Sequence, residues 1–264
     1  MSRLNFFPIR LAISTALLLL AYSVIRLLWY PGAYFAISGV SGQVWTLVAV
    51  VLVVGPILST LVFRPGKKGL KMDLWILGAI EVMAIAAALL IIYQRQPYFT
   101  VFAIDRFEAV SLPEVVDSDL ARKEFGSRPG HEPRLIFASL PEDPERMQAL
   151  IDETVLMGMP DIDRRPEFWA SYPSGVALVR EAARPLEELV AAAPGDAYEV
   201  SAWLESEDRS IQDYLFVPLR GRKGDAALII DTMTGYPVAS LAIDPWVSST
   251  QDGEPPGDIE QTHE

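Results

Sequence analysis

The sequence contains no cysteine and only two histidines among its 264 residues. Without cysteine there is no disulfide framework, thiolate nucleophile, iron–sulfur cluster or Cys-ligated zinc site. His131 lies in a Gly/Pro-rich stretch and His263 in a polar one, so neither is placed for a His-based metal site or a Ser-His-Asp triad. We therefore expect no metal, no other cofactor, no small-molecule substrate and no enzymatic activity.

Acidic residues are almost absent from the first 96 positions, where Asp73 and Glu81 stand against eight Lys and Arg, a net charge of +6. The remaining positions carry 32 acidic and 14 basic residues, a net charge of −18. An acidic surface of that size repels phosphate, which excludes a nucleic-acid-binding domain. The hydrophobic fraction of 51% excludes a disordered chain. The chain divides into a basic apolar part, 1–96, and an acidic water-soluble part.

Three long apolar runs predict that residues 1–96 form a three-helix transmembrane anchor. Their lengths suit a bilayer core of about 30 Å, and they cover residues 9–29, 42–63 and 74–94. Arg10 and Arg26 lie near the ends of the first run, where each side chain can reach a headgroup layer. A cleavable signal peptide is the alternative, but Trp29-Tyr30-Pro31-Gly32 and more apolar sequence follow this run in place of a cleavage site.

The charges of the short connections predict the orientation. The connection 30–41 is uncharged, whereas the next one is basic through Arg64, Lys67, Lys68 and Lys71. The positive-inside rule then places the N-terminus and the basic connection in the cytoplasm. Because the number of runs is odd, everything after Arg95 lies outside. We therefore predict a multi-pass protein in the lipid of a bacterial inner membrane, with a periplasmic C-terminal domain.

Glu81 is the one ionisable residue well inside an apolar run. A carboxyl group at membrane depth is costly, so it indicates either contact with a partner or a neutral Glu hydrogen-bonded within the bundle. Both interpretations stay open. In the second run, Gly55-Pro56 predicts a packing kink rather than a site, because proline removes a backbone donor.

Residues 97–247 suffice for one domain, and their patterning predicts an α+β fold with an antiparallel sheet. Short apolar runs bounded by charge, Pro or Gly predict strands at residues 98–104, 134–140, 197–204, 214–219, 226–231 and 238–244. Helical patterns cover residues 118–125, 144–157 and 175–193, the last interrupted at Pro185. In the second pattern Met147, Leu150, Ile151 and Val155 fall on one side.

Two further segments carry local signals. Asp231-Thr232-Met233-Thr234-Gly235 lies between two predicted strands and predicts a hairpin turn, in which Asp231 bonds back to the backbone and Gly235 takes a positive φ. A calcium loop is the alternative, but it would need further acidic ligands. Residues 248–264 carry five acidic side chains and no Lys or Arg, which predicts a disordered acidic tail.

Several stretches, in this order and spacing, resemble the type IV pilin accessory proteins of the TfpX/TfpZ group, inner-membrane proteins encoded beside particular pilins. The stretches that carry the resemblance are Trp29-Tyr30-Pro31-Gly32, Gly55-Pro56-Ile57-Leu58, residues 66–74, Gln96-Pro97-Tyr98, residues 101–108, Gly158-Met159-Pro160, residues 214–220, residues 231–235 and Asp244-Pro245-Trp246. Members of the group tend to carry an Asp early in the second run and a Gln in the third, where this chain has Val residues and Glu81. If those positions contact pilin, the partner preference differs here.

The resemblance implies a pilin-specific chaperone or modulator of pilin stability and pilus assembly, whose partner is a cognate type IV pilin subunit. Such a subunit has a hydrophobic N-terminal helix and a periplasmic head. We expect Gly78, Glu81, Ala84 and Ala88 to meet that helix, and the acidic domain to select the head. An alternative from another class is a membrane-tethered periplasmic sensor or protease-regulatory module, suggested by the pattern of the hairpin.

Overall fold

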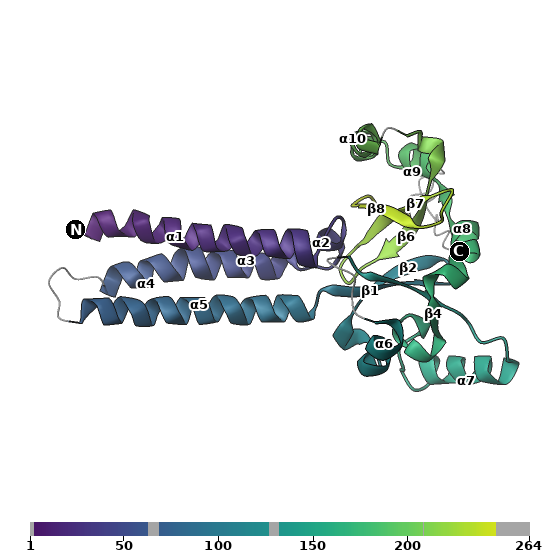
Figure 1. The fold of residues 1–264 in the computed structure, drawn as a ribbon, viewed down its shortest axis with the longest axis horizontal. Helices are drawn as coiled ribbons and strands as arrows, with labels where there is room; N and C mark the ends of the chain where they lie inside the picture. Colours follow the sequence, from purple (N-terminus) through teal and green to yellow (C-terminus); the bar gives the residue numbers. More distant parts are fainter. Residues whose placement is uncertain (1–2, 63–68, 127–131, 208, 247–264) are drawn as a thin grey trace, which may run out of the picture.

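A computed structural model describes residues 3–62, 69–126, 132–207 and 209–246. Long helices lie side by side at one end of the molecule, and a sheet with short helices forms the other end (Figure 1). Some sequence predictions fall outside the described residues: those for Arg64, Lys67, Lys68, His131, His263 and the tail 248–264. Lys71 lies in the first turn of the third long helix.

The long helices follow the three apolar runs closely. α1 (Arg3–Val24) continues into a π-helical turn, η1 (Ile25–Trp29). The second run forms α3 (Ser41–Ala49), a π-helical turn η2 (Val50–Val54) and α4 (Gly55–Val62). α5 (Leu70–Gln94) is one unbroken helix of 25 residues. Pro56 is the second residue of α4 and has no backbone N–H to donate to the preceding turn, which explains why the regular helical ladder is interrupted within η2.

Two helices of the described chain are long and apolar enough to cross a membrane: Phe7–Trp29 and Met72–Gln94, with 23 residues each. The prediction of three such helices is therefore confirmed for two of them. In the middle segment the apolar helix covers Ser41–Leu52, which is shorter than either of these two helices.

After α5, the described residues contain an eight-stranded sheet with the order β4-β3-β1-β2-β6-β7-β8, and β5 pairs with β6. The strands are β1 (Pro97–Ala103), β2 (Arg106–Ser111), β3 (Arg134–Ala138), β4 (Trp169–Ser171), β5 (Arg184–Pro185), β6 (Tyr214–Arg220), β7 (Asp225–Asp231) and β8 (Pro237–Leu241).

The predicted antiparallel sheet is wrong in one respect, because the observed sheet is mixed. β1 pairs with β3 in parallel, and β2 pairs with β6 in parallel. The cause is β2, which the sequence patterning missed. It forms a hairpin with β1 and occupies one side of that strand. The chain then returns through α6 (Ser118–Phe125) to the other side of β1, and such a crossover yields a parallel pair.

The predicted strand at 197–204 is also wrong, because these residues form α10 (Ala197–Glu207). Val200 is buried, and Trp203 and Leu204 pack against the same apolar cluster. Positions i, i+3 and i+4 share one helix face, so these apolar residues fit a helix better than a strand. The helical pattern at 175–193 forms α8 (Val176–Ala182) and α9 (Leu186–Ala192), separated at Pro185 as predicted.

The helix predicted at 144–157 is α7 (Pro144–Val155), but its apolar residues do not share one environment. Leu150 is buried and Met147 packs against the same cluster as β1 and β3. Ile151 and Val155 are exposed. The outer side of α7 therefore carries apolar residues that the sheet does not cover.

The uncharged connection after α1 is built into the sheet domain. It forms the short helix α2 (Tyr34–Ile37), and Ala33, Tyr34 and Ile37 are buried in one cluster with residues of β1 and β6. The Tyr34 hydroxyl lies 2.7 Å from Thr100 Oγ1, the Ala33 N–H donates to Ser240 Oγ at 2.9 Å, and the Lys223 N–H donates to the Ile37 carbonyl at 2.8 Å. This connection joins the long helices and the sheet into one packed body.

The hairpin turn predicted at 231–235 is confirmed between β7 and β8. Asp231 Oδ1 accepts bonds from the Thr234 N–H at 2.7 Å and from the Thr234 hydroxyl at 3.0 Å. Gly235 has a φ of +73° and donates its N–H to the Asp231 carbonyl at 2.8 Å. Arg209 lies 2.5 Å from the other oxygen of Asp231, so the carboxylate is fully engaged in a structural role.

Candidate functional site: a groove between apolar helices

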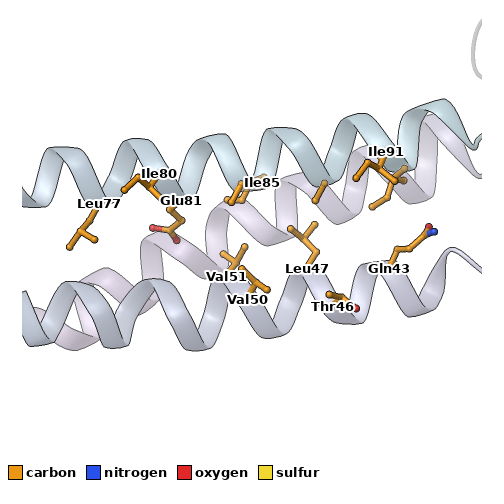
Figure 2. Close-up of a pocket in the computed structure, with 13 residues that line it drawn as sticks. Gln43, Thr46, Leu47, Val50, Val51, Leu77, Ile80, Glu81, Ile85 and Ile91 are labelled. Carbon is orange, nitrogen blue, oxygen red and sulfur yellow. The ribbon is translucent and has the colours of Figure 1, made fainter.

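A groove of about 450 Å³ runs between α5 and the segment formed by α3 and η2. Side chains from both walls point into the space between the helices (Figure 2). The wall from α5 consists of Leu77, Ile80, Glu81, Ala84, Ile85, Ala88, Ile91 and Ile92, and the opposite wall consists of Gln43, Thr46, Leu47, Val50 and Val51. The spacing of three and four residues along α5 places its members on one helix face.

Small side chains create the depth of the groove on the α5 side. Ala84 and Ala88 lie between the larger Ile80 and Ile91, and they project only a methyl group toward the opposite wall. In a bilayer, lipid chains are as apolar as leucine, so helices associate through close packing at small residues and through polar contacts. A groove floored by alanines is suited to take up side chains of another apolar helix.

Glu81 is the acidic group of the groove, and it is held by α1. Its carboxylate accepts a hydrogen bond from the Ser14 hydroxyl at 2.8 Å and forms an ion pair with Arg10. Only 8% of the Glu81 side chain is exposed, and Ser14 is fully buried. The prediction that Arg10 reaches a headgroup layer is therefore wrong, because its guanidinium turns inward to this carboxylate.

The structure brings together three of the four residues predicted to meet a partner helix. Glu81, Ala84 and Ala88 line the groove. Gly78 is on the same helix but is not among the lining residues. The sequence analysis missed the opposite wall on α3 and η2. A charge-free run gives little signal there, although the polar residues Gln43 and Thr46 lie within it.

The groove holds a single carboxylate among its lining residues. One carboxylate, already paired with an arginine and a serine, offers no free acid–base pair. Among the described residues, no group of three or more His, Asp or Glu side chains is placed to hold a metal ion. Apolar walls with few polar groups fit an apolar helix or an acyl chain.

The sheet domain has a partly buried charged cluster of its own. Glu108 on β2 lies near Asp163, with Arg220 at 3.7 Å and Arg164 at 3.9 Å. Burial and the neighbouring Asp163 carboxylate raise the pKa of Glu108 to about 7, although the arginines oppose this shift. Burial likewise raises the pKa of Asp163. These groups lie at the junction of β2 and β6, far along the chain from the groove.

The chain is similar to fimbrial assembly proteins. It is 24% identical over 229 residues to the fimbrial assembly protein of serogroup I from Dichelobacter nodosus, a match that covers 84% of this chain and 88% of that protein. It is 25% identical over 214 residues to the serogroup E1 protein of the same organism, covering 78% of this chain and 82% of that protein. No protein-family model and no solved structure matches the chain. Both alignments are longer than either the helical part or the sheet part, so each extends over both.

Proposed function

We propose that this chain assists the assembly of type IV fimbriae as an inner-membrane, pilin-specific chaperone or modulator of pilin stability. The observation that carries the proposal is the similarity to two fimbrial assembly proteins over most of the length of each. The stretches that resemble the TfpX/TfpZ group support the same function. The proposal involves no chemical step, and its partner is a cognate pilin subunit together with membrane lipid.

In this proposal the chain crosses the membrane three times and places the sheet domain in the periplasm. α1 and α5 both run toward the sheet domain (Figure 1). The chain must therefore return between them, and α3, η2 and α4 form that return path. The basic residues Arg64, Lys67, Lys68 and Lys71 follow the return path, which favours a cytoplasmic location for this end.

The groove is the proposed binding site for the hydrophobic helix of the pilin subunit. A waiting subunit needs an apolar surface within the bilayer, and the groove offers one with small residues at its floor. Glu81, held by α1, keeps a fixed polar group beside the incoming helix. The four predicted contact residues therefore reduce to Glu81, Ala84 and Ala88, with Gly78 outside the groove lining.

Photo-crosslinking in native membranes tests this site. A photoreactive residue at Ala84 is expected to capture the co-expressed, epitope-tagged pilin subunit. The same residue at Met83 is the matched control, because Met83 is on α5, is exposed and does not line the groove. Capture at Ala84 that exceeds capture at Met83 by about tenfold supports a specific helix site.

A groove-filling variant gives the functional readout. Ala84→Phe is expected to reduce pilin capture and surface fimbriae while leaving the amount of this protein unchanged, whereas Met83→Phe leaves both unchanged. Equal capture at positions 84 and 83, or crosslinks to lipid alone, contradicts the groove as the pilin site. Normal fimbriae in a deletion strain contradict the function itself and favour the periplasmic sensor or protease-regulatory alternative.

A further inference from the structure

The strongest unexplained feature outside the groove is a cluster of exposed apolar side chains at the C-terminal end of α7. We call it the α7 patch: Ile151, Val155, Leu156, Met157 and Met159. Val155, Leu156 and Met157 are 72%, 76% and 74% exposed. Single exposed apolar residues are common on protein surfaces, but a contiguous group marks an interaction site. Ile151 and Val155 lie one turn apart on the helix, Leu156 and Met157 follow directly in the chain, and Met159 comes after Gly158.

The patch is held in one conformation rather than left as a loose loop. The Leu156 and Met157 N–H groups both donate to the Asp152 carbonyl, at 2.8 and 3.3 Å, and the Met159 N–H donates to the Glu153 carbonyl at 3.0 Å. Gly158 has a φ of +68°, which allows the chain to turn directly after the helix. An ordered apolar surface loses less conformational entropy on binding than a flexible one.

A charged link fixes the patch to the domain core. The Glu153 carboxylate pairs with Arg165 at 2.6 Å, and Arg165 also pairs with Glu167 at 2.8 Å. The Arg165 guanidinium lies over the ring of Phe168, 4.9 Å from its centroid, and Phe168 is part of the buried cluster below α7. The base of the patch is therefore rigid, while its apolar side chains project outward.

The surroundings of the patch are acidic. Residues 151–161, which contain the patch, carry three carboxylates, Asp152, Glu153 and Asp161, and no Lys or Arg. The chain's own residues 248–264 carry five carboxylates and no Lys or Arg, and a second copy would bring an equally acidic segment. Like charges that face each other across an interface cost roughly several kcal/mol. Charge therefore disfavours both residues 248–264 and a second copy of the chain as the binding partner of the patch. The complementary partner has an apolar cleft with a basic rim.

The position of the α7 patch excludes the lipid bilayer as its binding partner. α7 lies in the sheet domain, away from α1, α3 and α5 (Figure 1). The bilayer that surrounds those helices therefore does not reach it. An ordered apolar surface in the water-soluble part, on the same side as the soluble head of a membrane-held subunit, fits a protein partner.

We infer that the α7 patch binds the water-soluble head of the same fimbrial subunit, through an apolar, basic-rimmed surface of that head. This inference rests on the proposed function and adds a second contact to it. The groove would hold the apolar helix, and the patch would recognise the head. Recognition of the head through an exposed apolar surface with Asp152 and Asp161 close by in the chain makes selectivity depend on the charge of the subunit.

Two crosslinking positions in the full-length protein test this inference. A photoreactive residue at Met157 is expected to capture the head of the co-expressed, tagged subunit. Tyr198 on α10 is the control, because it is 79% exposed and α10 lies at the opposite end of the sheet domain from α7 (Figure 1). The subunit is expected at Met157 and not at Tyr198, with the crosslinked peptide located in the head.

Paired substitutions give the magnitude. Leu156→Ser with Met157→Ser keeps the backbone bonds to Asp152 and is expected to reduce head capture about tenfold. Leu178→Ser with Tyr198→Ser removes exposed apolar side chains elsewhere and is expected to change nothing. Asp152→Asn with Asp161→Asn removes two charges while keeping amide acceptors, and is expected to reduce capture about two- to fivefold.

The outcomes separate the two proposals. Capture at Ala84 without capture at Met157 overturns the patch inference and leaves the groove intact. Crosslinks at Met157 to a second copy of this chain, or to residues 248–264, also overturn the inference. Loss of subunit capture at both positions counts against the proposed function. Head capture that is unaffected by the Ser pair contradicts the patch as the contact surface.

Discussion

Ser14 donates a hydrogen bond of 2.8 Å to Glu81, and this bond joins α1 to α5 across 67 positions of the chain. Arg10 forms an ion pair with the same carboxylate from one turn earlier on α1. Glu81 is thus both a link within the helix bundle and part of the wall of the groove. Glu81 is hydrogen-bonded within the bundle and also lines the groove, so it fits both interpretations of an ionisable residue in the apolar run: an internal hydrogen bond and contact with a partner.

Replacing Glu81 with leucine is expected to destabilise the protein by about 3 kcal/mol, because it removes the buried carboxylate that pairs with the partly buried Arg10 guanidinium. The double variant Arg10→Leu with Glu81→Leu is expected to recover most of that loss, since both charges are then absent. Thermal unfolding of the detergent-solubilised protein measures both. A double variant no more stable than Glu81→Leu would show that the pair is not coupled.

Tyr34→Phe is expected to lower stability by about 1–3 kcal/mol, because it leaves the hydroxyl of Thr100 without its partner in a site with no solvent access. Tyr198→Phe, at an exposed position, is the control and is expected to have no effect. Hydrogen exchange of residues 30–40 should speed up in the first variant. Unchanged exchange there would contradict the role of Tyr34 in joining the connection to the sheet.

The Glu108 carboxyl is expected to make the sheet domain less stable as pH rises from about 4.5 to about 7. Its pKa in the folded state is about 7, above the ordinary value of 4.5, so the folded state binds more protons than the unfolded state in this range. The stabilisation contributed by Glu108 is therefore fully present below pH 4.5 and is lost as the pH rises to about 7. Glu108→Gln should flatten the profile of unfolding temperature against pH in that window and raise stability at pH 8. A profile of unchanged slope would contradict the assignment.

Asp231→Ala is expected to cost about 2 kcal/mol at pH 7, since the carboxylate accepts bonds from Thr234 and pairs with Arg209. The Arg209 side chain, followed by the Thr234 bonds, lowers the pKa of Asp231 to about 2, although burial opposes this shift. The folded pKa lies below the ordinary value of 3.8, so this stabilisation is present above 3.8 and lost as pH falls through 2. Asp119→Ala, at a carboxylate 93% exposed, is the control. Denaturant unfolding at pH 7 and pH 2.5 should show a difference between wild type and Asp231→Ala that shrinks at the lower pH.

Local sequence patterns correctly predicted those strands and turns that are determined by residues close together in the chain. β1, β3, β6, β7 and β8 coincide with predicted strands within a few residues, and the turn at Asp231–Gly235 forms from its own side chains. β2 and α10 were missed for different reasons. β2 is specified by its pairing with β1. The apolar residues of α10 fit the period of a strand as well as that of a helix, and the packing of Val200, Trp203 and Leu204 in one apolar cluster decides for the helix.

The candidate site was predicted in part, for a reason that the groove makes clear. Glu81 stood out because a single carboxyl in an apolar run is costly, and Ala84 and Ala88 because their spacing follows one helix face. The opposing wall on α3 and η2 depends on how two helices diverge in space, which no local pattern encodes. The α7 patch is the opposite case, because the sequence pattern predicts that Ile151 and Val155 continue the apolar side of α7. Only the tertiary structure shows that both side chains are exposed.

The sequence by itself determined the division into a basic apolar part and an acidic part, the extents of the long helices and the absence of cysteine. These features follow from composition and from runs of similar residues, whose effects do not depend on which segments of the chain pack together. The tertiary structure decided the parallel strand pairs, the burial of Tyr34 against Thr100, the inward turn of Arg10 and the exposure of the α7 patch. Each of these depends on contacts between residues distant in the chain, and their free energies exist only once the packing partners are in place.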